Sequence, residues 1–240
     1  MRWFIENIGI MSKEKIDSTD EKIEAIEGAL SRTEQFIEAN YRKILYGVAG
    51  VAVIVALFFG YKYLILAPKE KEAQKQIYAA EQFFARDSFK LALNGDGNAL
   101  GFAQIADNFG STKTGNLACY YAGICNLRLG SFEKAIDFLK SYDASDKIVG
   151  TLATIAIGDA YVELNKLEDG ADYYIKAANM DKNLFTSPNA FMKAGGVYEA
   201  LGKYSEALEA YNTIKKEYPK SMEARDIEKY IARAELKMVK

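Results

Sequence analysis

The sequence contains no histidine, only two cysteines and only three prolines among its 240 residues. Without histidine, triads and proton shuttles built on imidazole and imidazole metal sites are excluded. Two cysteines alone cannot supply the four ligands of a structural zinc site. We therefore predict that the chain is not an enzyme and that it holds no metal ion and no cofactor.

Net charge is also nearly absent, since 31 Lys and Arg residues stand against 33 Asp and Glu residues. A protein that binds nucleic acid normally presents a basic face to the phosphates, so we expect no nucleic-acid partner. Half of the residues are apolar, which excludes a wholly disordered chain. A chain of this length is expected to form one or two domains.

One long apolar run sets the class of protein. Residues 44–61 read ILYGVAGVAVIVALFFGY, without a charge, and after Lys62 the apolar residues continue to Leu66. About 20 apolar residues in a helix span the core of a bilayer, so residues 44–66 are predicted to be a transmembrane signal-anchor. Tyrosines at both ends suit the membrane interfaces: Tyr41, Tyr46, Tyr61 and Tyr63. A buried core helix and a cleaved signal peptide are less favoured, because the run is long and a 43-residue tail precedes it.

The charges beside this segment orient it only weakly. Two basic residues precede it and three follow it closely: Arg42, Lys43, Lys69, Lys71 and Lys75. The bias in Lys and Arg is thus nearly even. A loose helical stripe of apolar residues predicts a helix over 18–39 in the tail of residues 1–43. Whether the protein starts at Met1 or Met11 stays open.

Three small residues share one face of the predicted span. Ala52, Ala56 and Gly60 lie at positions i, i+4 and i+8. Such a stripe lets a second membrane helix approach closely. Small residues are also common in spans without helix partners, so the sequence leaves both interpretations open.

Beyond Pro68 the sequence repeats itself. A glycine and a second small residue twelve positions later recur three times: Gly123 and Ala135, Gly158 and Gly170, Gly195 and Ala207. The first glycines of successive pairs are 35 and 37 residues apart. Each pair predicts two antiparallel helices that cross closely, because a small residue on each helix lets the backbones approach.

The last of these units resembles the tetratricopeptide repeat most fully. The resemblance is carried by Gly195, Tyr198, Leu201-Gly202, Tyr204, Ala207, Tyr211 and Pro219, with Phe191 in the place of the opening tryptophan. The two earlier units keep most of the pattern, although Asn165 replaces the turn glycine of the second. The spacings are close to the 34-residue period of that family.

The resemblance implies an all-α fold, in which a single N-terminal transmembrane helix precedes a right-handed α-solenoid of helix hairpins over residues 69–240. The expected parts are a degenerate unit at 69–112, repeats at about 116–147, 151–184 and 188–221, and a polar capping helix at 221–239. In the degenerate unit, a helix over Lys69–Leu91 is expected to pair with one over Ala99–Phe109.

Other groups of polar residues have plain structural interpretations. The run from Asn94 to Asn98 has the glycines of a helix–helix turn and departs from a calcium loop at its later positions. Cys119 and Cys125 lie six residues apart on one predicted helix, a rise of ~9 Å that no disulfide spans. We expect both thiols to be packed in the core.

In the tetratricopeptide family the first helix of each unit lines a concave groove that binds protein segments. Carried over by position, the groove residues are Tyr120, Ile124, Arg128, Ile155, Asp159, Glu163, Met192 and Glu199. Their mixture of aromatic, aliphatic and charged types suits a polypeptide better than a nucleic-acid backbone. The same positions also suit contacts between repeats, and the sequence leaves both open.

The order of the parts resembles the bacterial family of ancillary subunits of the SecYEG translocon. That family has a short tail, one signal-anchor and a tetratricopeptide domain. The resemblance implies a protein of the inner membrane with a cytoplasmic N-terminus and periplasmic repeats. It implies partners among translocon subunits, periplasmic chaperones and exported polypeptides. The alternative is a scaffold of the same fold that coordinates cell-envelope assembly or cell division.

Overall fold

The computed structural model describes residues 34–239. The expected tail helix over 18–39 and the choice between Met1 and Met11 therefore lie largely or wholly outside the described residues. The chain divides into two units, Met1–Tyr63 and Leu64–Lys240.

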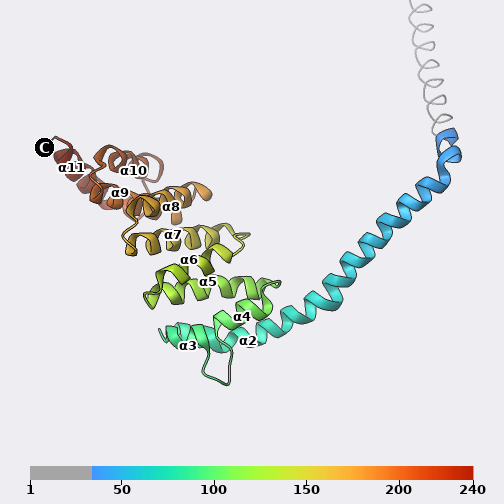
Figure 1. Ribbon diagram of the computed structural model, residues 1–240. Coiled ribbons are helices and arrows are strands. Elements are labelled where there is room, and N and C mark those ends of the chain that lie inside the picture. Colours follow the sequence, from blue (N-terminus) through green and yellow to red (C-terminus); the bar gives the residue numbers. More distant parts are fainter. Residues whose placement is uncertain (1–33, 240) are drawn as a thin grey trace, which may run out of the picture. The chain divides into compact units, whose positions relative to one another are not determined.

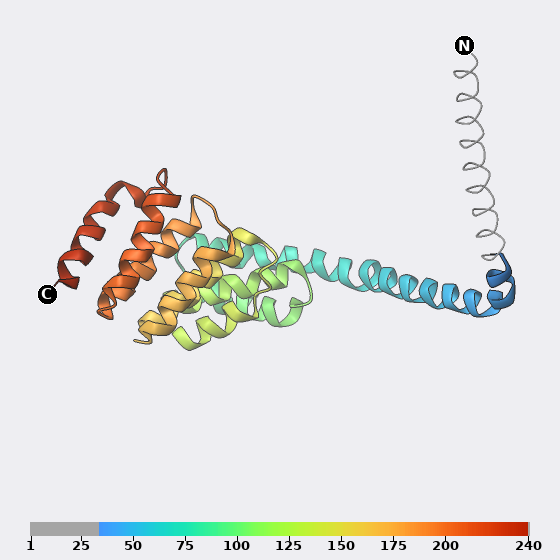
Figure 2. The same cartoon turned by 90° about the horizontal axis from the view of Figure 1, so that it is seen from above.

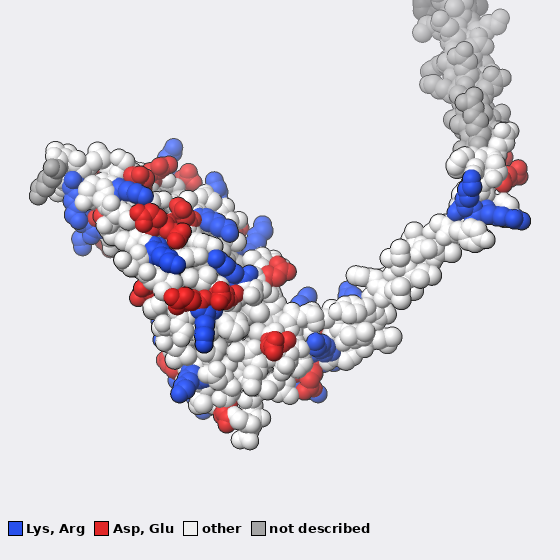
Figure 3. Space-filling model, in the orientation of Figure 1, with Lys and Arg blue, Asp and Glu red and all other residues white. Residues whose placement is uncertain are grey.

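The N-terminal unit is helical from residue 34 to residue 60, where a π-helical turn, η1 (Tyr61–Leu66), follows. The apolar side chains of this segment are exposed, with Leu57 at 68% and Phe58 at 60%. Figure 3 shows the helix as a stretch without charged atoms between basic groups at its two ends. The helix Glu34–Ala85 is long and apolar enough to cross a membrane, which confirms the prediction of one long apolar helix.

The C-terminal unit is a curved stack of helices in chain order (Figure 1), and Figure 2 shows the same stack from above. Its elements are α2 (Ala67–Ala85), α3 (Phe89–Asn94), α4 (Phe102–Phe109), α5 (Lys113–Arg128), α6 (Phe132–Ser141), α7 (Lys147–Glu163), α8 (Leu167–Met180), α9 (Thr186–Ala200), α10 (Tyr204–Glu217), η2 (Glu223–Asp226) and α11 (Ile227–Met238). Each helix packs against the next. Within residues 34–239 no strand is present, and the predicted fold class, all-α with packed helix pairs, is confirmed.

Four hairpin turns share one backbone closure. The turn residue adopts a left-handed conformation in each, at Asp87, Gly130, Asn165 and Gly202. The residue after it donates its backbone N–H to a carbonyl five positions back, as in Lys203 N to Tyr198 O at 2.8 Å. This is a Schellman closure, which satisfies the last carbonyls of the first helix.

The first hairpin differs from the one predicted. The expected helix Lys69–Leu91 is wrong, because α2 ends at Ala85 and Asp87 has φ of 55°. Its mate is α3, which starts at Phe89, rather than a helix beginning at Ala99. Aspartate tolerates the left-handed region because its short side chain is polar and unbranched at Cβ.

Two alanines form the pair of small residues in this first hairpin, so that an alanine stands where the later units have their first glycine. Ala80 and Ala92 are twelve residues apart and both are fully buried, as the two small residues of each later unit are. The solenoid thus begins with the same crossing that the three glycine-bearing units use. Its second helix is short because the run from Gly95 to Gly101 interrupts it before α4.

In the three later units, the absence of a side chain on the first glycine leaves room for a large side chain of the second helix. A Cβ at Gly123 would meet the Leu139 side chain at 2.5 Å, and one at Gly158 would meet Cδ1 of Tyr174 at 2.7 Å. A Cβ at Gly195 would overlap the ring of Tyr211. These contacts fix how each hairpin closes, and they place the first helices where they can line a common surface.

Candidate protein-binding groove

A groove of about 810 Å³ lies along α5 and α7 and reaches α9 at Lys193. Six of the eight predicted positions line it: Tyr120, Ile124, Arg128, Ile155, Asp159 and Glu163. Five further apolar residues line it: Leu127, Phe132, Leu152, Ala156 and Val162. The structure therefore gathers the predicted residues of the first two glycine-bearing units on one surface.

The spacing of these residues explains why they meet. On each helix they occupy positions i, i+4 and i+8, which lie one above the other on the same face. The glycine of each helix, Gly123 or Gly158, points instead toward the second helix of its own hairpin. One face of α5 and α7 is thus used for closing the hairpins, and an adjoining face is left for the groove.

Asp159 is the most engaged charged residue of the groove. Its Oδ1 accepts a hydrogen bond from Tyr174 Oη at 2.6 Å and one from Lys193 Nζ at 2.8 Å. Both bonds go to Oδ1, so that Oδ2 has no hydrogen-bond donor among residues 34–239. The side chains of Asp159 and Lys193 are 31% and 38% exposed. The cluster therefore ties α7, α8 and α9 together, while the partly exposed Asp159 keeps one carboxylate oxygen without a donor from residues 34–239.

The tyrosine of this cluster stays protonated. Burial raises the pKa of Tyr174 strongly, and the charge of Asp159 and its hydrogen bond raise the pKa further. Tyr174 is therefore a permanent donor to Asp159. The ammonium of Lys193 also lies 5.6 Å from the centre of the Tyr174 ring, within the range of a cation–π contact.

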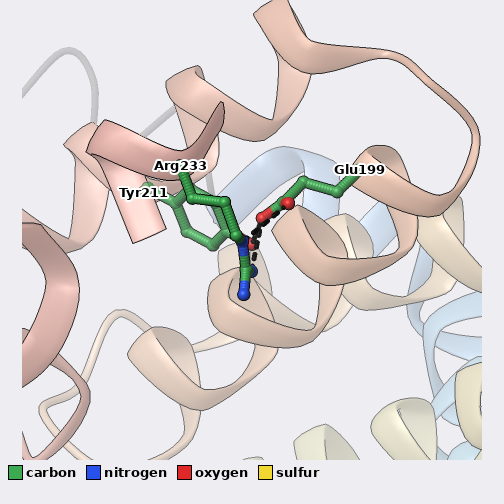
Figure 4. Close-up of polar contacts among 3 residues, drawn as sticks. All are labelled: Glu199, Tyr211 and Arg233. Atoms are coloured by element: carbon green, nitrogen blue, oxygen red, sulfur yellow. Dashed lines mark hydrogen bonds and ion pairs between the residues drawn. The ribbon is translucent and has the colours of Figure 1, made fainter. Parts of the chain in front are cut away.

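The remaining two predicted residues, on α9, do not line the groove. Met192 is half-buried against the core cluster of the C-terminal half. Glu199 points toward α10 and α11 (Figure 4). Its carboxylate accepts hydrogen bonds from Tyr211 Oη at 2.8 Å and from Arg233 Nε and Nη2 at 2.9 and 2.6 Å. Glu199 thus joins the last repeat to the capping helix.

The environment of Glu199 favours its charged form. Burial alone raises the pKa of this carboxyl, but hydrogen bonds from Arg233 and Tyr211, together with the positive charge of Arg233, lower it below its usual value. Burial and the bond to Glu199 raise the pKa of Tyr211. At neutral pH the cluster is therefore a carboxylate, a phenol and a guanidinium.

The other polar groups weighed from the sequence are structural. In the turn after α3, the backbone N–H groups of Asn98 and Ala99 donate to Asp96 Oδ1 at 2.9 and 2.8 Å. Cys119 and Cys125 are buried, and burial raises the pKa of Cys125 to about 12. Among residues 34–239, no three Cys, Asp or Glu side chains lie close enough to hold a metal ion.

Sequence reasoning missed Lys193 and Tyr174 as members of the groove. One signal was available for the lysine, which stands two residues before its repeat glycine where the earlier units carry Tyr121 and Ala156. A charge that interrupts an apolar position of a repeat points to a partner in the neighbouring unit. The tyrosine carried no such signal, since it is also the side chain that Gly158 seats.

Comparison with known proteins agrees with this architecture. Residues 155–221, from the middle of α7 to the end of α10 and the loop after it, match the family model of the tetratricopeptide repeat. No curated protein matches the chain. The matched stretch contains the last glycine-bearing hairpin, most of the one before it and half of the residues that line the groove. Repeats of this kind typically serve protein interaction.

Proposed function

We propose that the chain is a non-catalytic, membrane-anchored scaffold whose groove along α5 and α7 holds a segment of a partner protein. The single observation that supports this best is the groove itself, an elongated surface built from successive units. Stacked helix hairpins typically use such a surface to bind extended or helical segments.

The chemistry of the groove favours a polypeptide over a nucleic acid. Two basic and two acidic residues line it: Arg128, Lys193, Asp159 and Glu163. A surface without net charge gains little from phosphates, whereas it suits a segment with side chains of both signs. Apolar side chains such as Ile124 and Leu127 offer contacts to aliphatic groups of the same segment.

We further propose a place for the protein in the bacterial inner membrane, with the N-terminus in the cytoplasm and the repeats in the periplasm. Support comes from the uncharged segment 44–61 and from the order of the parts, which resembles the ancillary translocon subunits. Translocon subunits, periplasmic chaperones and exported polypeptides are the partners this predicts. The small-residue face of Ala52, Ala56 and Gly60 remains a predicted contact for a partner helix.

Site-specific photo-crosslinking tests the proposal. A photoreactive phenylalanine analogue is placed at Ile124 in the groove, at Ala56 in the span, and at Leu236 as a control. Leu236 is 70% exposed on α11, away from the groove. We expect translocon subunits from Ala56, chaperones or exported polypeptides from Ile124, and neither from Leu236.

Two other results would change this proposal. Cell-wall synthesis enzymes or outer-membrane assembly factors at Ile124 would favour the alternative scaffold in envelope assembly or cell division. Equal crosslinking from Ile124 and Leu236 would contradict a role for the groove.

A further inference from the structure

A second hollow adjoins the groove and has a different character. It has a volume of about 440 Å³ and shares Leu152 and Ile155 of α7 with the groove. Its outer wall consists of three apolar side chains from two loops, Leu184, Phe185 and Met222. The groove therefore continues into a pocket that is mostly apolar.

The three outer side chains are unusually exposed. Leu184, Phe185 and Met222 are 57%, 72% and 74% exposed, although they are flanked by buried residues such as Thr186 and Ser221. Large apolar side chains gathered at the rim of a hollow indicate an interaction site rather than ordinary surface. Covering them with a partner would remove apolar surface from water.

A hydrogen-bond network holds Leu184 and Phe185 in place. Asn183 Oδ1 accepts hydrogen bonds from the backbone N–H groups of Phe185 and Thr186, both at 2.8 Å. Asn183 Nδ2 donates hydrogen bonds to Asp181 O and Thr186 Oγ1. The loop is thus fixed to the start of α9. Because the backbone that carries these two side chains is preorganised, binding need not order the loop itself.

Met222 is held by a similar device in the loop after α10. Ser221 donates its backbone N–H to Tyr218 O at 2.9 Å, and Ser221 Oγ accepts from Ala224 N at 3.2 Å. The serine side chain thereby caps the turn of η2. Two separately fixed loops, one from each side, present the apolar rim.

The charged residues around the hollow indicate which side chains would flank an apolar ligand side chain bound in it. Glu223 is the only charged residue among the eight that line it. In the adjoining groove, Asp159 is already paired with Lys193, whereas Glu163 forms no ion pair within residues 34–239. A basic side chain next to an apolar one would meet complementary charge on either side of the hollow.

We propose that the hollow formed by Leu152, Ile155, Leu184, Phe185 and Met222 is the anchor subsite of the groove. Its occupant is a polypeptide segment with a large apolar side chain flanked by lysine or arginine. This inference rests on the proposed function, because it assigns the chemistry of the segment that the groove holds. The apolar side chain fills the hollow, and the basic side chains face Glu223 and Glu163.

Binding of a defined peptide tests the subsite. The probe has Leu-Phe at its centre, flanked by lysines in a Gly-Ser background, and the full chain is held in lipid nanodiscs. Phe185→Trp reports on the hollow, in a Trp3→Phe background that removes the one natural tryptophan. We expect the peptide to shift the emission to shorter wavelength, whereas Leu236→Trp in the same background does not respond.

Substitutions then locate the contacts. Phe185→Ser and Met222→Ser should each weaken binding about tenfold, as expected for loss of a large apolar contact. Glu223→Gln should weaken it about threefold, and that loss should disappear in high salt. The control Leu236→Ser removes an apolar side chain of equal exposure and should leave binding unchanged.

Three results would overturn the inference. Absence of binding at millimolar peptide would do so, and so would a peptide affinity that Phe185→Ser leaves unchanged. Quenching of the Phe185→Trp emission by brominated lipids in the nanodisc, without peptide, would assign the rim to the membrane surface instead. Crosslinking from Ile124 is independent of these measurements, so the proposed function can stand while the subsite fails.

Discussion

Two parts of the solenoid each combine a carboxylate, a tyrosine hydroxyl and a cation, and use them differently. Asp159, Tyr174 and Lys193 meet at the groove, while Glu199, Tyr211 and Arg233 meet under the capping helix. In both, a carboxylate of a first helix accepts a bond from a tyrosine of the second helix and pairs with a cation of the next unit.

The difference lies in how completely the carboxylate is used. Both oxygens of Glu199 are bonded and its side chain is 7% exposed, whereas Asp159 is 31% exposed and bonded through Oδ1 alone. A carboxylate, a tyrosine and a cation can therefore form a buried contact at the end of a repeat array and a partly exposed one in its middle. The comparison teaches that closure, rather than residue type, separates a structural cluster from a binding surface.

Removing the cation of each cluster should give the largest difference in stability between the two clusters. Arg233→Met keeps the aliphatic stem but leaves Glu199 buried without its partner, which should cost about 2–3 kcal/mol. Lys193→Met removes a half-exposed pair and should cost less than about 1 kcal/mol. Hydrogen exchange of α11 and α9 in the full chain measures both. Equal loss of protection in the two variants would contradict the contrast.

Replacing the glycine beside each cluster should reduce stability equally, because each glycine leaves room for the tyrosine ring. Gly195→Ala and Gly158→Ala push a methyl group into the rings of Tyr211 and Tyr174. Overpacking exceeds the gain in helix propensity, so each should cost about 1–2 kcal/mol net.

The adjacent glycine provides the matched control. A Cβ at Gly196 would have nothing within 4 Å, so Gly196→Ala should stabilise the protein by about 0.5–1 kcal/mol. Urea unfolding in detergent micelles compares the three variants. A loss of stability in Gly196→Ala as large as that in Gly195→Ala would show that packing at the glycine is not the cause.

The tyrosine hydroxyls should give a smaller contrast. Tyr211→Phe removes a donor from a buried carboxylate and should cost about 1 kcal/mol. Tyr174→Phe should cost about 0.5 kcal/mol, because water can reach Asp159 and replace the bond. Thermal unfolding of the two variants checks the order, and a larger loss for Tyr174→Phe would reverse it.

Acid should have the smallest effect on the closed cluster. The folded-state pKa of Glu199 lies below its usual value, so its stabilising contribution is present above the unfolded pKa, near 4.5, and is lost as the pH falls through the folded pKa. Unfolding of the wild type should therefore depend more steeply on pH below that value than unfolding of Arg233→Met. Parallel pH profiles would contradict this assignment.

The repeat pattern predicted the helices where glycine marks the crossing. It failed at the first hairpin, where Ala80 stands in the place of the first glycine and Asp87 replaces the turn glycine. Both substitutions are physically permitted, because alanine is small and aspartate tolerates the left-handed region. A pattern that relies on glycine cannot detect a site where another residue meets the same constraint.

The groove was predictable to the extent that it follows helical spacing. The six residues at positions i, i+4 and i+8 of α5 and α7 line one surface, and their role in binding stays a prediction. The orientation of Glu199 depends on Arg233, which lies 34 residues later, and the apolar rim depends on how two loops fold. Contacts between units and loop conformations are tertiary properties, and a single repeat does not encode them.

The uniform closure of the hairpins has a consequence for how this molecule can change. Along one edge the chain reverses with the same backbone hydrogen bond at all four turns. Along the other edge the segments that join units differ, as 110–112 and 181–185 do. Exchanges of exposed side chains in the joining segments, such as Leu184 and Phe185, would leave the packing between helices intact. New ligand preferences can therefore arise there by drift or by grafting, without any redesign of the architecture that carries them.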